Sequence, residues 1–173
     1  MSVWRQMRAI GLLPVAGTLI VPGIIVWSTD AVNVGWGLPS GVDLLPPVLG
    51  ATLIGLGLLL VVRTVALFAT VGQGTLAPWD PTSRLVARGP YRHVRNPMIS
   101  GVLSILLGEA VLLGSLLLLA WFGTFLAANS IYIPLVEEPG LGRRFGVDYE
   151  VYRAHVPRWL PRLRAWDPPR ADG

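Results

Sequence analysis

Residues 88–97 place several basic and amide side chains immediately before a long apolar run. The side chains able to bind a ligand there are Arg92, His93, Arg95 and Asn96. Pro97 suits the first turn of a helix, and the unpaired N–H groups of a helix start attract anions, as guanidinium groups do. The stretch therefore predicts a site for a carboxylate or a phosphate. From charge alone, an arginine collar that binds anionic lipid is the simpler interpretation.

A pair of carboxylates and a set of spaced aromatic residues follow the last apolar run. Glu137 and Glu138 are expected to form ion pairs with nearby arginines, or to accept hydrogen bonds from hydroxyls or an ammonium group of a ligand. The aromatic residues are Phe145, Tyr149 and Tyr152. Their spacing predicts a short amphipathic helix over 139–154 that packs on the bilayer surface, although aromatic faces also attract a cation.

The residue inventory excludes several classes of site. The chain has no cysteine, and His93 and His155 are its two histidines, so we expect no metal centre. It has no lysine either, which excludes a lysine Schiff base and a P-loop. The net charge is +4, but the arginines flank apolar runs and do not alternate with exposed aromatic residues. This pattern indicates a membrane edge and no nucleic-acid partner.

The elements that must position these residues are apolar helices. The chain has 173 residues, of which 53% are hydrophobic and 14% charged, a composition too apolar for an ordinary soluble domain. The expected transmembrane helices are 9–28, 48–71, 98–113 and 116–136. The last two come from one run too long for a single helix, and Gly114 and Ser115 predict the turn of a tight hairpin.

The distribution of arginine predicts how the helices are oriented. The N-terminus, the 72–97 loop and the tail all carry arginine, whereas the 29–47 loop carries none. Both termini are therefore expected to be cytoplasmic. The predicted fold is all-α: a single domain, 1–173, with a four-helix membrane bundle and a cytoplasmic tail, 137–173. We expect an integral protein of a bacterial inner membrane that contacts membrane lipids. The sequence does not indicate an oligomeric state.

Two ionisable residues interrupt the apolar runs. Arg63 either faces a partner or a water-filled cavity, or extends to the headgroups, and its depth suits both equally. Glu109 reaches the outer interface or, with favourable tilt, pairs with Arg63. In the third helix, Ser100, Ser104 and Gly108 recur every four residues and predict close packing against a neighbouring helix.

Two motifs around the hairpin resemble a known family. They are GPYRHVRNPMISG (89–101) and EEPGLGRRFGVDYEVYRAHVPRWLP (137–161), and GQGTLAPWDP (72–81) precedes them. This order resembles the membrane methyltransferases typified by isoprenylcysteine carboxyl methyltransferase and phospholipid N-methyltransferases. The family pattern before the hairpin is usually Arg-His-Pro-x-Tyr-x-Gly, and Asn96 and Ile99 stand here where that pattern has histidine and tyrosine. The matching residues are Arg95, Pro97 and Gly101, then Glu137, Glu138, Phe145, Gly146, Tyr149 and Tyr152.

The resemblance implies S-adenosylmethionine as cofactor, bound between the cytoplasmic end of the hairpin and the tail. Its carboxylate would be held by Arg92 and Arg95, and its ammonium group or ribose by Glu137 and Glu138. The other residues expected to line the cofactor site are Asn96, Pro97, Gly101 and Tyr149. A lipophilic or prenylated acceptor would enter sideways from the bilayer.

The expected catalytic residues depend on the acceptor. A carboxylate acceptor needs an arginine such as Arg158 or Arg63 to orient it. An amine acceptor needs a base such as His93, His155 or a glutamate, with Glu138 the first choice among the acidic residues.

The same motifs are compatible with two other functions. One alternative is an NADPH-dependent membrane reductase of the sterol-reductase type, which carries similar motifs, and another is a non-catalytic protein on the same scaffold. The methyltransferase interpretation requires that Arg95 and Glu138 converge on one site.

Overall fold

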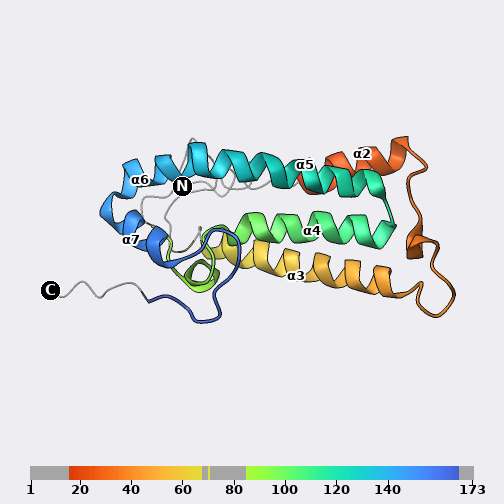
Figure 1. Cartoon of the computed structure of the whole chain (residues 1–173), viewed down its shortest axis with the longest axis horizontal. Coiled ribbons are helices and arrows are strands. Elements are labelled where there is room, and N and C mark those ends of the chain that lie inside the picture. The colour runs from red at the N-terminus through yellow and green to blue at the C-terminus, as the bar shows by residue number, and fades with distance from the viewer. Residues whose placement is uncertain (1–15, 68–69, 71–84, 168–173) are drawn as a thin grey trace.

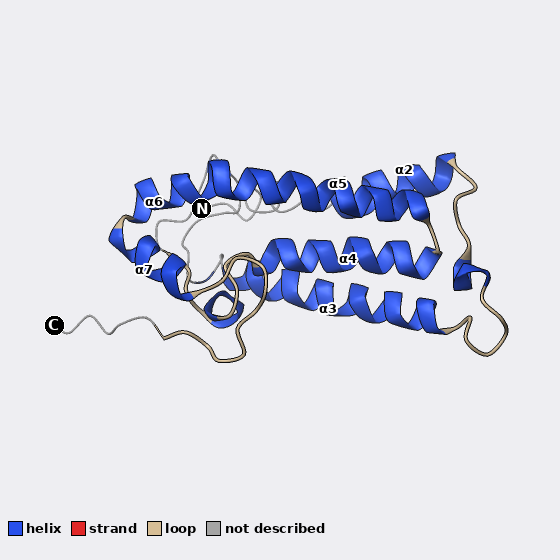
Figure 2. Cartoon of the chain, in the orientation of Figure 1, coloured by secondary structure: helices blue, strands red, loops and turns tan. Residues whose placement is uncertain are grey.

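The structure is a computed structural model that describes residues 16–67, 70 and 85–167. Within these ranges every regular element is a helix, and none is a strand (Figure 2). The α-helices are α2 (Val21–Ser28), α3 (Leu45–Leu67), α4 (Pro97–Leu113), α5 (Leu116–Tyr132), α6 (Glu138–Phe145) and α7 (Val147–His155). The shorter helical turns are η1 (Ala16–Ile20), η2 (Val34–Gly37), η4 (Gly89–Arg92) and η5 (Ile133–Glu137).

The long helices run side by side along one axis (Figure 1). Helix α4 lies between α3 and α5 and is antiparallel to both, while α2 packs beside α5. Helices α4 and α5 form a hairpin that turns where the sequence predicts it. Gly114 ends α4 with a left-handed φ of 61°, and the Ser115 side chain accepts a hydrogen bond from the N–H of Leu118 at 3.4 Å. The start of α4 and the end of α5 therefore meet at the same end of the bundle.

Small residues bring α3 and α4 into close contact. A Cβ added to Gly108 would lie 2.7 Å from the Gly50 carbonyl oxygen, and one added to Gly101 would lie 2.9 Å from the Gly57 carbonyl oxygen. Between these contacts, the Ser104 hydroxyl donates to the Leu53 carbonyl at 2.8 Å. The packing interpretation of the small-residue stripe is thus confirmed at Ser104 and Gly108. At the remaining position of the stripe, the Ser100 hydroxyl donates to the Asn96 carbonyl of its own helix. The close contact with α3 near this position is made by the next residue, Gly101.

Two described helical runs are long and apolar enough to cross a membrane, Leu45–Leu67 and Leu116–Phe145. The apolar helices Pro97–Leu113 and Ala16–Ser28 are shorter. Residues 9–15 of the first expected span and the 72–81 motif lie outside the described residues. Helix α3 begins three residues earlier than the sequence predicts, because prolines 46 and 47 occupy its first turn, where their missing N–H groups have no helical partner to lose.

The predicted boundary after residue 136 is wrong. Helix α5 continues through the π-helical turn η5 directly into α6, so the helical run extends to Phe145. Pro134 lies in the first part of this widened turn and Pro139 follows it in α6, and each lacks the N–H group that an α-helical ladder requires. The single helix predicted over 139–154 is also wrong. It is two helices, α6 and α7, broken at Gly146, whose φ of 54° ends α6.

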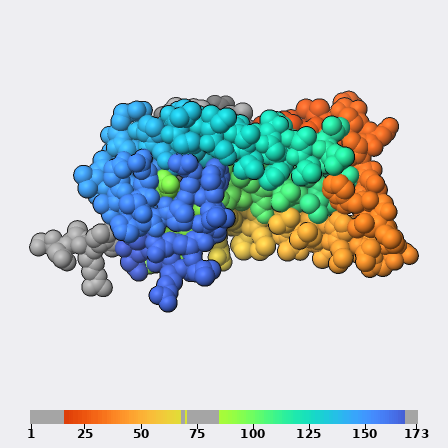
Figure 3. Space-filling view, viewed as in Figure 1, coloured from red at the N-terminus to blue at the C-terminus, as the bar shows by residue number. Residues whose placement is uncertain are grey.

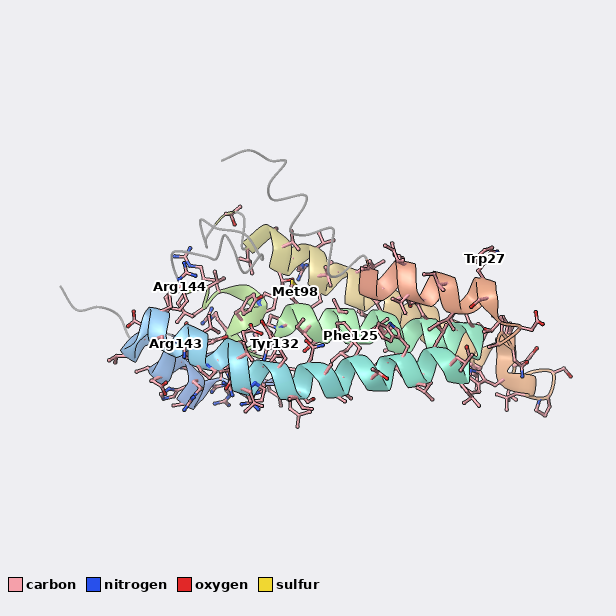
Figure 4. All side chains as sticks on the ribbon, turned by 90° about the horizontal axis from the view of Figure 1, so that it is seen from above. Trp27, Met98, Phe125, Tyr132, Arg143 and Arg144 are labelled. Atoms are coloured by element: carbon pink, nitrogen blue, oxygen red, sulfur yellow. The ribbon has the colours of Figure 1, made fainter. Side chains whose placement is uncertain are left out.

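The two ends of the bundle carry different residues. Figure 4 shows Trp27 at one end and Arg143 and Arg144 at the other. At the Trp27 end, the last carbonyls of α4 are covered by the 29–44 loop. The Asn33 N–H donates to the Leu113 carbonyl at 2.8 Å, and the Trp36 indole donates to the Val111 carbonyl at 2.9 Å.

The two charged residues of the apolar helices lie apart. Arg63 is exposed on α3, which fits extension toward the headgroups. Glu109 on α4 is half-buried, and its Oε2 atom has no hydrogen-bond partner in the described part of the chain. The two residues form no ion pair there.

Candidate functional site

A buried carboxylate organises the end of the bundle that carries the arginines. Glu138, only 5% exposed, begins α6 at the point where the hairpin returns to the start of α4. Its Oε1 accepts a hydrogen bond from Arg95 Nη1 at 2.7 Å and another from Arg158 Nε at 2.7 Å. Its Oε2 accepts from Arg158 Nη2 at 2.9 Å. The carboxylate therefore holds together residues from three separate parts of the chain.

The electrostatics of this cluster follow from its contacts. The hydrogen bonds to Glu138 raise the pKa of Arg158 above its ordinary value. Tyr149 lies behind the cluster, 2% exposed. Burial raises the pKa of its hydroxyl and the charge of Glu138 raises it further, whereas a hydrogen bond with Arg95 acts in the opposite direction. Arg95 therefore contacts both Glu138 and Tyr149, and all three are fixed in place.

The aromatic residues of the tail face the protein interior. Tyr149, Tyr152 and Val156 are buried together, packed against Leu85, Ala87, Leu141, Phe145 and Trp166. The Tyr152 hydroxyl donates to the Tyr91 carbonyl at 2.8 Å, and burial raises its pKa. The prediction that the aromatic stripe packs on the bilayer surface is therefore wrong. The stripe instead attaches α7 to the segment before α4.

Residues 156–167, here called the tail segment, pair with residues 92–95. The Arg95 N–H donates to the Pro157 carbonyl at 2.9 Å, the Arg162 N–H to the His93 carbonyl at 3.0 Å, and the Trp166 N–H to the Arg92 carbonyl at 2.9 Å. These backbone contacts hold Arg158 beside Glu138. Nothing in the sequence patterns predicts them, because they join segments with no regular hydrophobic period.

Two side chains that the sequence predicts to bind a ligand, Arg92 and His93, contact the tail segment. The Arg92 guanidinium donates to the Trp166 carbonyl at 2.7 Å and forms an ion pair with Asp167. His93 Nδ1 lies 2.8 Å from the Arg162 carbonyl oxygen. Because a carbonyl only accepts, Nδ1 carries the proton, and in the neutral ring Nε2 is left as an acceptor.

Three polar groups near the start of α4 keep unused bonding capacity. Arg95 Nε and Asn96 Nδ2 are buried, and neither has a hydrogen-bond partner among the described residues. Asn96 stands at the position before α4 where asparagine usually caps a helix, yet its side chain makes no capping bond. Glu137 is half-buried and forms no ion pair within the described ranges. Buried donors of this kind require an explanation, and a bound ligand is one.

Comparison with known proteins identifies the family. Residues 45–148 match the family model described as phospholipid methyltransferase. The chain belongs to the phospholipid methyltransferase family. No curated protein matches the chain. The family is one of membrane methyltransferases, which fits the apolar helices of the bundle.

The region matched to the phospholipid methyltransferase family contains part of the cluster. It includes Arg95, Asn96, Glu137 and Glu138, whereas Tyr149, Arg158 and the tail segment follow its last matched residue. The remaining predicted cofactor residues lie inside the match with evident packing roles. Pro97 is buried at the first position of α4, and Gly101 faces Gly57 of α3. A cofactor contact for either stays a prediction.

Proposed function

We propose that the protein transfers a methyl group from S-adenosylmethionine to a lipid acceptor at the end of the bundle where Arg95 and Glu138 meet. The observation that carries this proposal is the pair of buried, unpartnered donors, Arg95 Nε and Asn96 Nδ2, at the start of α4 in the described structure. They lie inside the region matched to the phospholipid methyltransferase family. Glu138 is bonded to two arginines, so its proposed role is to hold the site together.

The unused polar groups suit this cofactor. S-adenosylmethionine presents a carboxylate, an ammonium group and ribose hydroxyls, so its site needs donors and acceptors together. Arg95 Nε and Asn96 Nδ2 would donate to carboxylate or hydroxyl oxygens, and Glu137 would accept from the ammonium group or a hydroxyl. Arg92 contributes indirectly, since it holds the tail segment. When bound, the cofactor supplies a methyl group on a positively charged sulfur, and the protein aligns the acceptor and excludes water.

The positions of the arginines favour an amine acceptor over a carboxylate. Arg158, expected to orient a carboxylate, is bonded to Glu138 through two of its nitrogens. Arg63, the other candidate, is exposed on α3. An amine must lose a proton before it attacks the methyl group, and the proposed base is Nε2 of His93. A lipid with an amine headgroup is therefore the proposed acceptor class.

We expect the purified protein, reconstituted with phosphatidylethanolamine, to incorporate labelled methyl from S-adenosylmethionine into lipid. A prenylated cysteine analogue offered in the same vesicles should stay unlabelled, because Arg158, the arginine of the cluster expected to orient its carboxylate, is already bonded to Glu138. Thin-layer separation of the extracted products measures both. Label in the prenylated analogue alone would overturn the amine assignment. No label in either, together with tight binding of NADPH in a spectroscopic titration, would favour the reductase alternative.

The Asn96→Leu variant distinguishes a role of Asn96 in cofactor binding from a role in the stability of the fold. Removal of a buried donor that lacks a partner should leave the free energy of unfolding unchanged or slightly increased, since no hydrogen bond is lost. The same change should weaken S-adenosylmethionine binding by about 5- to 150-fold, corresponding to a ligand hydrogen bond worth about 1–3 kcal/mol. Calorimetric titration and thermal unfolding in detergent measure the two effects. Unchanged affinity would remove Asn96 from the cofactor site.

A further inference from the structure

The tail segment carries two large apolar side chains that contact almost nothing in the protein. Leu163 is 100% exposed and Leu160 is 81% exposed. Both lie outside the apolar helices, on the irregular stretch after α7. If this stretch only packed on the bundle, its leucines would be expected to be buried. Two exposed leucines three residues apart on one loop form an apolar patch of the kind that contacts a membrane or another molecule.

Hydrogen bonds of the tail segment fix the positions in which these leucines are exposed. Backbone hydrogen bonds fix the segment before Leu160, between the two leucines and after Leu163: from Arg95 to Pro157, from Arg162 to His93 and from Trp166 to Arg92. The side chain of Arg162 also donates to the His155 carbonyl at 2.8 Å. Leu160 and Leu163 are therefore presented on an anchored loop and do not belong to a freely moving end.

The loop lies at the level where a membrane-crossing helix ends. A Cβ added to Gly89 would lie 3.0 Å from Leu67 Cδ1, so η4 sits beside the last turn of α3. Residues 92–95 follow η4 directly and bind the tail segment. In the space-filling view, blue atoms from this part of the chain project sideways from the bundle, next to the yellow end of α3 (Figure 3). The ribbon shows the same sideways loop after α7 (Figure 1).

The charges around the two leucines are positive. Residues 156–166 contain no acidic side chain, and Asp167, which follows them, is paired with Arg92. Arg158 is engaged in an ion pair with Glu138. The side chain of Arg162 donates to a neutral carbonyl, and neither Arg162 nor Arg164 has an acidic partner in the described ranges, so both keep their charge available. Exposed apolar side chains interleaved with arginines are typical of a segment that lies in a membrane interface and contacts anionic headgroups.

We propose that residues 159–164 form a membrane-interface loop. Leu160 and Leu163 enter the boundary between headgroups and acyl chains at the end of α3, and Arg162 and Arg164 contact anionic lipid headgroups. The proposal depends on the bundle crossing the membrane and on the loop geometry, and it holds whether or not the protein transfers methyl groups. Its consequence is that the membrane adds a second attachment to the backbone hydrogen bonds that hold the tail segment, and with it Arg158, beside Glu138.

The absence of cysteine from the chain makes a direct test possible. An environment-sensitive NBD label is attached to Leu163→Cys in the full chain, and the protein is reconstituted in phosphatidylcholine vesicles with and without phosphatidylglycerol. The control is Glu150→Cys on α7, an exposed position whose side chain is 55% exposed. Circular dichroism and gel filtration of both labelled proteins confirm that the fold is retained. Quenching by lipids with a nitroxide near the headgroup is compared with quenching by aqueous iodide.

We expect the label at position 163 to be quenched severalfold more by nitroxide lipid than the label at position 150, with the reverse order for iodide. Phosphatidylglycerol should increase nitroxide quenching at position 163, and the additional change Arg164→Gln should reduce that increase. Equal iodide quenching at the two positions would overturn the proposal. Protection from iodide without nitroxide quenching would also overturn it, because a second copy of the chain or another protein would then cover the loop.

Discussion

Glu138→Gln is expected to lower the free energy of unfolding by about 3–5 kcal/mol, the usual cost of removing one partner of a buried ion pair. The substitution keeps the shape of the side chain but leaves Arg95, whose side chain is 11% exposed, without a counter-charge. It also removes the ion pair with Arg158, so the tail segment loses its charged contact with α6. Thermal or denaturant unfolding in detergent, together with the methyl-transfer assay, measures the effect, and both stability and activity should fall.

The matched control is Glu150→Gln. It makes the same chemical change in an exposed pair, Glu150 with Arg153 at 3.4 Å, and should cost less than about 1 kcal/mol. Both glutamates lie in the helices after α5. Each variant therefore removes one negative charge from the arginine-rich end of the bundle, and any effect of that lost charge alone should be the same in both. Similar losses for the two variants would mean that the Glu138 cluster contributes no more than a surface ion pair.

Gly57→Ala is expected to destabilise the bundle by about 1–3 kcal/mol through overpacking. A Cβ at this position would lie 2.6 Å from the Gly101 carbonyl oxygen and 2.8 Å from Ile105 Cγ1. The first of these atoms is backbone, so α3 and α4 must move apart to relieve the contact. Because α4 carries Arg95 at its start, its displacement should also reduce methyl transfer.

Gly55→Ala, two residues earlier in α3, is the control for this prediction. A Cβ there meets nothing within 4 Å, so the change should stabilise the helix by up to about 1 kcal/mol through its intrinsic propensity. Opposite signs for the two variants in the same unfolding experiment would establish the helix contact as the cause. A stabilising effect of Gly57→Ala would contradict the close packing of α3 and α4.

The sequence predicts best those features that local patterns determine. The turn at Gly114 and Ser115 follows from the length of the apolar run and from the conformational preference of glycine. The contact of Arg95 with Glu138 follows from the hairpin, because antiparallel helices of similar length bring the flanking residues of both to one end.

Features that depend on pairing between distant segments could not be read from the sequence. The sequence predicts a cofactor contact for Arg92 and gives no sign of its bonds to Trp166 and Asp167, more than seventy residues away. The tyrosine stripe has the same spacing whether it faces a bilayer or a protein core, and only the position of the tail segment decides which. The unpartnered donors Arg95 Nε and Asn96 Nδ2, and the lack of an ion pair for Glu137 in the described residues, depend on every contact around them and so cannot be predicted from a local pattern.

The π-helical turn at the end of α5 has a consequence for variation in this protein. The Glu138 N–H bonds to the Ile133 carbonyl five residues back, so the direction of the carboxylate depends on how many residues separate it from the hairpin turn. Deletion or insertion of one residue would rotate Glu138 by about 100° around the helix axis, away from both arginines. Natural variants should therefore keep the number of residues between the hairpin turn and Glu138 constant, even where the exposed residues of this stretch differ.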